Sequence, residues 1–145
     1  DRPIVAFNRE SSSGTYGFFK KAVLNKESFA QLQTVGANGE LVEKVRANPN
    51  ALGYVGVAYV DTNLVNTIAV AKEDTGRAVA PTLANASNGS YPLVRPLYYY
   101  YLASNAARVE PVLSYMRQAS GQELVLKAGY MPNPAFLNLT AARIH

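Results

Sequence analysis

Residues 4–23 read IVAFNRESSSGTYGFFKKAV, and this stretch decides the fold. The apolar run from Ile4 to Asn8 has the length of a buried strand. After a polar turn, apolar side chains recur at helical spacing, and Asn25 offers a stop signal. These apolar residues are Phe18, Phe19, Ala22 and Val23. A strand, a turn and a helix in direct succession predict an α/β fold.

The chain downstream carries further helix signals. Asn38 is expected to cap a second helix in which Glu40 and Lys44 form an i,i+4 ion pair. Asn48-Pro49 would end this helix, because the residue before a proline resists helical geometry. A third helix is expected with Pro111 in its first turn. The apolar stripes of the two helices are Leu41, Val42 and Val45, and Val109, Val112, Leu113 and Met116.

The last predicted helix and the remaining strands complete the α/β pattern. Ser120 and Glu123 form a capping box for a final helix through Lys127, which Gly129 would close. Strands are expected at residues 52–60, at residues 67–71 and in the tyrosine-rich segment 91–101, whereas residues 84–89 are typical of a turn.

Composition excludes several classes of function. The 145 residues are 48% hydrophobic and 17% charged, which is typical of a globular protein. The absence of Cys and the presence of one His, His145, argue against nucleophilic triads and metal cages. We therefore expect no catalytic activity, no metal and no cofactor. The net charge of +4 is spread along the chain without a basic stripe, so we expect no nucleic-acid partner.

The turn between the first strand and the first helix is the candidate site. Ser13, Gly14 and Thr15 would lie at a helix N-terminus, where backbone N–H groups lack intrahelical partners and the helix dipole is positive. Arg9, at the end of the strand, can bring a guanidinium to the same point. These groups suit a tetrahedral oxyanion. From the spacing alone, simple helix capping by the serines is an equal alternative.

Four motifs in this order resemble the periplasmic phosphate-binding proteins of ABC transporters. The first is the site turn, residues 9–15, followed by Phe19. The others lie at residues 51–56 (ALGYVG), at residues 90–98 (SYPLVRPLY), and at Ser120-Gly121-Gln122 with residues 129–132 (GYMP). Together they extend over most of the chain.

The resemblance implies a type II periplasmic-binding-protein fold, the two-lobed Venus-flytrap architecture. Residues 1–93 would form most of the second lobe, and residues 94–145 would hold the hinge strand and the C-terminal helices that return to the first lobe. The preceding first-lobe half would be absent from this chain. The implied function is binding of inorganic phosphate between the lobes and its delivery to an ABC permease, in the periplasm or at the cell surface.

The resemblance also assigns roles to the residues of the turn. Arg9, Ser13, Gly14 and Thr15 match the family's phosphate ligands. Ser11 stands where many relatives carry an Asp that braces the arginine, and Ser12 stands where a glycine is common. Arg9 would instead be supported by Glu10, with Ser11 and Ser12, or by a segment missing from this chain.

The chain is therefore expected to carry half a site, which the missing half or a second copy would complete as a partner. Apolar surface on the last helices would then favour pairing or dimerisation. An alternative function is an interaction or sensory module that reuses the same fold with weak or no anion binding.

Overall fold

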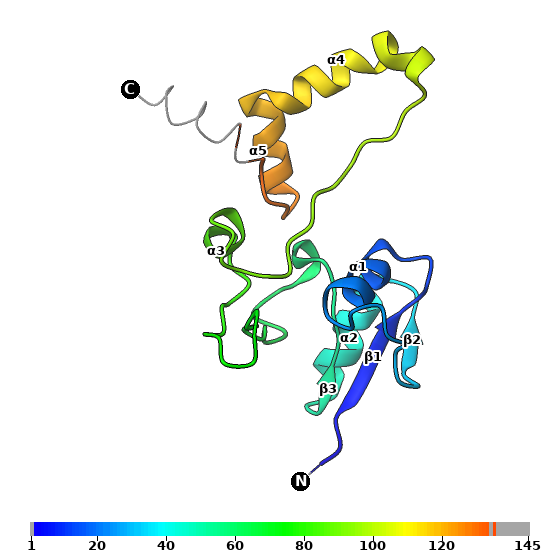
Figure 1. The fold of residues 1–145 in the computed structure, drawn as a ribbon, viewed down its shortest axis with the longest axis vertical. Coiled ribbons are helices and arrows are strands. Elements are labelled where there is room, and N and C mark those ends of the chain that lie inside the picture. Colours follow the sequence, from blue (N-terminus) through cyan, green and yellow to red (C-terminus); the bar gives the residue numbers. More distant parts are fainter. Residues whose placement is uncertain (1, 134, 136–145) are drawn as a thin grey trace. The chain divides into compact units, whose positions relative to one another are not determined.

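A computed structural model describes residues 2–133 and residue 135, and it divides the chain into two compact units (Figure 1). The first unit ends at Ala69 and the second begins at Val70. His145 and the end of the predicted segment 94–145 lie outside the described residues. Among the described residues, no helix is both long and apolar enough to cross a lipid bilayer.

The first unit is built on a small parallel sheet. Its central strand, β1 (Val5–Arg9), pairs in parallel with β2 (Gln33–Val35) on one side and with β3 (Ala51–Leu52) on the other. Helix α1 (Gly14–Ala22) connects β1 to β2, and helix α2 (Asn38–Ala47) connects β2 to β3. The predicted α/β class and the predicted strand–turn–helix unit are both confirmed.

The core of this unit lies between the sheet and α2. Phe7 of β1, Val35 of β2 and Leu41 of α2 form a buried cluster, and Val35 and Leu41 are 1% and 2% exposed. Side chains of a strand point alternately to its two faces, so Phe7 and Arg9 share the face that α2 covers. Gly53 follows β3 and lies against Leu41, where an added Cβ would overlap the leucine side chain.

Three features of this unit differ from the sequence-based expectations. Strand β2 was not predicted. The N-cap of α2 is Ala37, which offers no side-chain cap, and Asn38 is the first helical residue. The strand expected at residues 52–60 is limited to β3, and a short 3-10 helix, η1 (Val57–Tyr59), follows it. Glu40 and Lys44 do form the expected pair, with Nζ and Oε1 3.8 Å apart.

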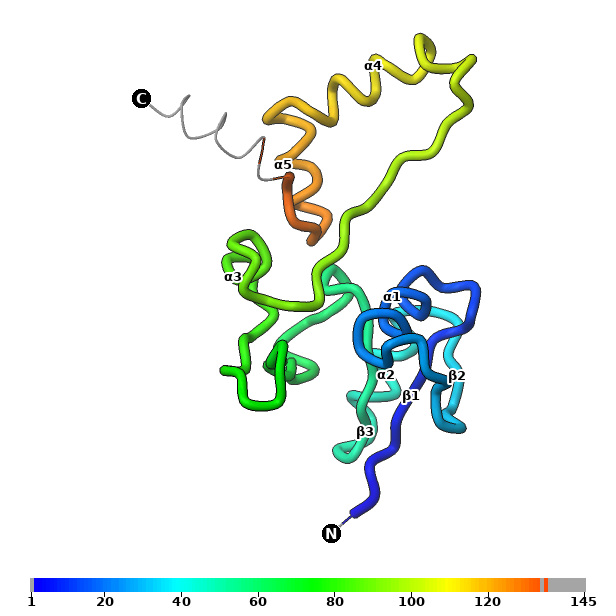
Figure 2. The backbone as a smooth tube through the Cα atoms, in the orientation of Figure 1, coloured from blue at the N-terminus to red at the C-terminus, as the bar shows by residue number. Residues whose placement is uncertain are grey.

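The second unit begins with little regular structure. The strand expected at residues 67–71 is reduced to a single antiparallel bridge between Val70 and Val79. Helix α3 (Leu83–Ser87) takes up the first part of the expected turn, and the Thr82 hydroxyl caps it by accepting from the Asn85 amide at 3.1 Å. Residues 88–89 form a turn, as expected. Residues 91–102 adopt neither helix nor strand, so the expected tyrosine-rich strand is wrong; Figure 2 shows this segment as an extended trace after α3.

Two helices close the described part of the second unit. A short 3-10 helix, η2 (Ala103–Asn105), leads into α4 (Ala106–Arg117), and α5 (Ala119–Lys127) follows. Pro111 lies inside α4 rather than in its first turn, and Gln118 takes the N-cap position of α5, so the expected capping box does not form.

The end of α5 is as expected. Gly129 has a φ of 79°, a left-handed conformation that glycine adopts without a Cβ penalty. The amides of Gly129 and Tyr130 donate to the carbonyls of Leu126 and Val125, at 2.9 and 3.1 Å. This pattern is a Schellman motif, which satisfies the last carbonyls of the helix.

The contact between Gly53 and Leu41 yields a stability prediction. We expect Gly53→Ala to lower the free energy of unfolding by about 1–3 kcal/mol, because the added methyl group must displace a fully packed side chain. Gly39→Ala is the matched control: Gly39 lies in α2 with open space around it, and alanine there should stabilise by about 0.5–1 kcal/mol. Urea unfolding followed by circular dichroism measures both. Equal effects of the two substitutions would contradict this packing.

Candidate functional site

The candidate site lies where the three strands of the first unit end. All three are parallel, so their carboxyl ends meet at one edge of the sheet. Arg9 is the last residue of β1, Gly36 follows β2, and Tyr54 lies two residues beyond β3. Open parallel sheets bind ligands outside this edge, at the position where the strand order reverses. Here the reversal lies at β1, which has β2 on one side and β3 on the other.

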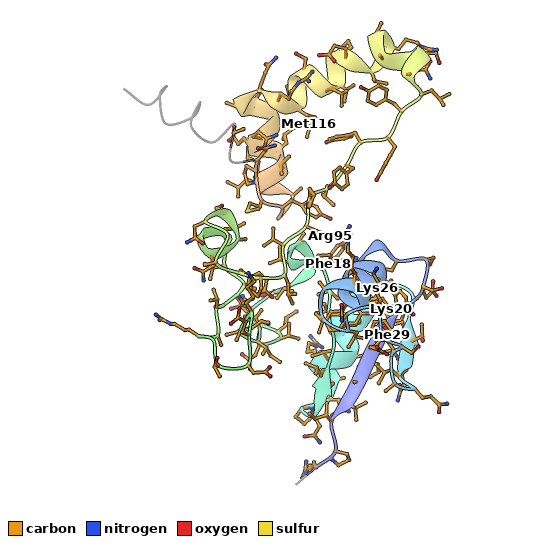
Figure 3. The ribbon with its side chains drawn as sticks, viewed as in Figure 1. Phe18, Lys20, Lys26, Phe29, Arg95 and Met116 are labelled. Carbon is orange, nitrogen blue, oxygen red and sulfur yellow. The ribbon has the colours of Figure 1, made fainter. Side chains whose placement is uncertain are left out.

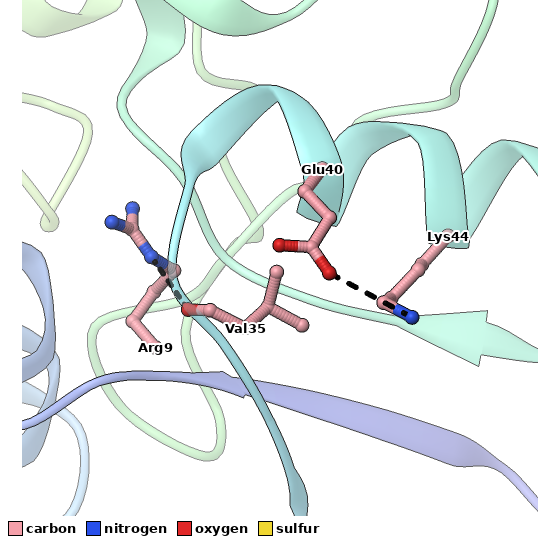
Figure 4. Close-up of polar contacts among 4 residues, drawn as sticks. All are labelled: Arg9, Val35, Glu40 and Lys44. Carbon is pink, nitrogen blue, oxygen red and sulfur yellow. Dashed lines mark hydrogen bonds and ion pairs between the residues drawn. The ribbon is translucent and has the colours of Figure 1, made fainter.

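Arg9 is buried at this edge, with 7% of its surface exposed. Its Nε donates to the carbonyl of Val35 at 3.3 Å (Figure 4), and its Nη2 donates to the carbonyl of Gly36 at 2.8 Å. Its Nη1 donates to the side-chain oxygen of Asn38, at the start of α2. A guanidinium has five N–H donors, so two of them remain for a ligand.

The three acceptors of the Arg9 side chain among the described residues are all uncharged. Among the described residues, Arg9 forms no ion pair, and the carboxylate next to it, Glu10, accepts from the Ser12 hydroxyl at 3.5 Å. The orientation of Arg9 thus comes from β2 and α2 rather than from Glu10, Ser11 or Ser12. A buried charge without a counter-charge is costly, and an anion bound at this edge would lower that cost.

The N-terminus of α1 supplies amide donors next in sequence. Ser13 is the N-cap, and its Oγ accepts from the Thr15 amide at 3.2 Å. The capping role that the sequence left open is therefore present. It also removes the Thr15 amide from the set of free donors. The amides of Gly14 and Tyr16 have no partner among the described residues, and the Ser13 hydroxyl proton stays available.

An open hollow of about 410 Å³ lies at this edge of the sheet. Four of the residues singled out from the sequence line it: Arg9, Glu10, Ser11 and Ser12. Its other lining residues are Asn8, Tyr16 and Thr34. Ser13, Gly14 and Thr15 are not among the lining residues; they lie directly beyond it, in the first turn of α1. The structure therefore brings Arg9 and the turn together around a space open to solvent.

Tyr54 and Asn8 support the backbone beneath Arg9. The Tyr54 hydroxyl donates to the side-chain oxygen of Asn8, which also accepts from the Arg9 amide at 2.9 Å. The Tyr54 ring stacks on Phe19 of α1, with ring centroids 4.1 Å apart. The Phe29 ring, labelled in Figure 3, stacks against both of these rings. Burial raises the pKa of Tyr54, so the hydroxyl stays a donor at neutral pH.

Asn8, Asn38 and Tyr54 are the site residues that sequence reasoning missed. Asn38 had been interpreted as a helix cap, and Tyr54 as part of a longer strand. The one sequence signal for these residues is their position, since each lies at or just after the end of a strand of a parallel sheet. That position can be recognised only if β2 is predicted as a strand. No cluster of His, Cys, Asp or Glu suited to a metal ion occurs in the part of the chain that the structure describes.

Comparisons with known proteins agree with this geometry. A family profile described as "PBP superfamily domain" matches residues 1–118. The chain is 36% identical over 139 residues to the "Phosphate-binding protein PstS" of Pseudomonas aeruginosa, covering 92% of this chain and 43% of that protein. It is 31% identical over 138 residues to "Protein SphX" of Synechococcus elongatus. The chain thus spans less than half the length of these curated relatives.

Two solved structures share the fold over about half of their own length. One is a possible phosphate binding protein from Planctomyces limnophilus, with a TM-score of 0.73 and 27% identity, over 99% of this chain and 53% of that one. The other is a putative phosphate ABC transporter substrate-binding protein with bound phosphate from Clostridium perfringens. It has a TM-score of 0.73 and 29% identity, over 92% of this chain and 53% of that one. The expected periplasmic-binding-protein fold is confirmed.

The raised pKa of Tyr54 yields a prediction about alkaline stability. In the unfolded chain this hydroxyl ionises near its ordinary pKa of about 10, whereas in the folded protein it ionises at higher pH. The folded state therefore holds more protons, and the free energy of unfolding should fall as the pH rises above about 10.

We expect Tyr54→Phe to make this fall shallower, leaving a remainder from Tyr91, whose pKa burial also raises. Tyr59→Phe, at a half-exposed position, is the control. Urea titrations between about pH 9 and pH 11 measure the slope. A slope unchanged in Tyr54→Phe would show that the Tyr54 hydroxyl is not buried in the folded protein.

Proposed function

The chain belongs to the PBP superfamily, and we propose that it binds inorganic phosphate at the carboxyl edge of its sheet as part of the solute-binding component of an ABC importer. The observation that carries this proposal is the buried Arg9 guanidinium, held by three uncharged acceptors beside an open hollow. A hydrogen phosphate dianion would supply the missing counter-charge.

The ligands proposed within this chain are Arg9, Ser13, Gly14 and Thr15. Arg9 would donate from its two remaining N–H bonds, and Gly14 from its free amide. Ser13 would donate its hydroxyl proton while its oxygen continues to cap α1, and Thr15 would contribute its hydroxyl, since its amide is engaged. Hydrogen bonds to charged groups contribute about 1.5–3 kcal/mol each, so a few of them suffice for tight binding in a closed cleft.

The proposed cellular location and transport step rest on the similarity to the relatives. We propose that the protein acts in the periplasm or outside the cell, where it would capture phosphate and pass it to a membrane permease. Its part in transport is binding and release, without a catalytic step.

Because the chain spans about half the length of its relatives, we propose that this site is one side of a cleft. The other side would come from the complementary half or from a second copy. Apolar side chains on the second unit support such a partner. Val112 of α4, Leu124 and Leu126 of α5, and Tyr98 to Tyr101 are all exposed, with Tyr100 at 90%.

Binding is tested by isothermal titration of phosphate, with sulfate as comparison, into exhaustively dialysed chain. We expect phosphate to bind and Arg9→Ala to weaken binding at least about tenfold, because a charge-assisted interaction is lost. Arg46→Ala is the matched control: it removes the same charge from an exposed ion pair with Glu43 on α2. An equal loss in both variants, or no phosphate binding even with the complementary half restored, would contradict the proposed function.

Self-association is tested by sedimentation velocity over a range of concentrations. We expect the chain to form a dimer as its concentration rises, because burial of exposed apolar area drives association. Replacing Leu124 and Leu126 by Ser should weaken the dimer, whereas Ile68→Ser, at a similarly exposed position in the first unit, should not. A monomer at every concentration would argue against a second copy as the partner.

A further inference from the structure

We propose that Asn38 is a positioning residue that holds the Arg9 guanidinium without neutralising it, so that the bound oxyanion becomes the counter-charge of Arg9. The inference deepens the proposed function, on which it rests. Its central claim concerns the ligand-free protein, and can therefore be tested even if phosphate does not bind.

In the part of the chain that the structure describes, Asn38 is the one side chain among the acceptors of the Arg9 guanidinium. The other two acceptors are the main-chain carbonyls of Val35 and Gly36, whose chemistry no substitution can change. The hydrogen bond from Nη1 to the side-chain oxygen of Asn38 holds the third nitrogen of the guanidinium. The residue at position 38 therefore decides whether Arg9 is held by a neutral group or by an anion.

Stability alone would favour aspartate at this position. Aspartate has the same shape as asparagine and keeps an oxygen where Nη1 donates, and its charge would form a hydrogen-bonded pair with Arg9. Position 38 is also the first residue of α2, where the helix dipole stabilises a negative side chain. Both effects favour a carboxylate, yet the residue is a neutral amide. The neutral amide leaves the charge of Arg9 to a ligand.

The charged groups near Arg9 also support the conclusion that its charge is left to a ligand. Glu10, the carboxylate next to Arg9 in sequence, accepts from the Ser12 hydroxyl at 3.5 Å. Within the described residues, Arg9 thus has no carboxylate partner, although it is 93% buried. The free amides of Gly14 and Tyr16 add partial positive charge at the start of α1. An oxyanion is the ligand class that matches this positive charge.

The test substitution is Asn38→Asp, which changes the charge and little else. The control compares Gly39→Asp with Gly39→Asn. The difference between these two variants gives the effect of the same charge one residue further along α2. A Cβ added at position 39 meets no atom within 4 Å outside its own stretch of helix backbone, so this pair serves as the reference for the helix-dipole effect. Stability is measured by urea unfolding at low ionic strength without phosphate, and phosphate affinity by isothermal titration.

We expect Asn38→Asp to raise the folding equilibrium constant about tenfold more than the Gly39 pair does, because the buried guanidinium gains a counter-charge. In the same variant, phosphate should bind at least about tenfold more weakly, because Arg9 is already neutralised. Greater stability with weaker binding is an outcome that a merely structural asparagine would not produce.

Two results would overturn the inference. The first is a stability gain no larger than that of the Gly39 pair, which would mean that Arg9 carries no unmet charge. The second is unchanged phosphate affinity in a stabilised Asn38→Asp variant, which would mean that this charge is not used by the ligand. If no phosphate binds even with the complementary half restored, the proposed function fails, and the stability measurement alone decides the role of Asn38.

Discussion

The first unit is organised around a buried cation at the edge of a parallel sheet. Arg9 ends β1, and its guanidinium is held by the carbonyls of Val35 and Gly36 and by the Asn38 side chain. These partners belong to β2, to the turn after it and to α2, so the position of Arg9 depends on the pairing of β1 with β2 and on the start of α2. Since no carboxylate pairs with it in the described chain, the fold holds a charge that an oxyanion can balance.

Contacts on both faces of β1 hold this strand in place. Phe7 packs with Val35 and Leu41 under α2, and Gly53 lets β3 approach that helix closely. On the other face, Asn8 binds Tyr54, whose ring stacks on Phe19 of α1. Packing on one face and an aromatic stack on the other thus fix the strand from which Arg9 projects, and they align α1 beside it.

Local signals in the sequence were enough for the first strand, the turn and α1, because a cap at Ser13 and helical spacing of apolar residues are properties of neighbouring positions. Strand β2 was not predicted because it is only three residues long. Its Gln33 and Thr34 are exposed, so the strand has no alternation of apolar and polar residues. Without β2, Asn38 looked like a helix cap. The tyrosine run at 98–101 favours a strand by propensity, but a strand forms only against a partner strand, and the described residues offer none there.

The central claim is that the Arg9 guanidinium is buried, held in place and available to an oxyanion, and NMR of arginine side chains tests it most directly. The account predicts that the Nε–H signal of Arg9 is visible in the ligand-free protein and moves on addition of phosphate, together with the amides of Gly14 and Tyr16. The signal of Arg46, in its surface pair, should stay in place. An Arg9 signal that is unmoved at high phosphate concentration, or that moves no more than that of Arg46, would contradict the account.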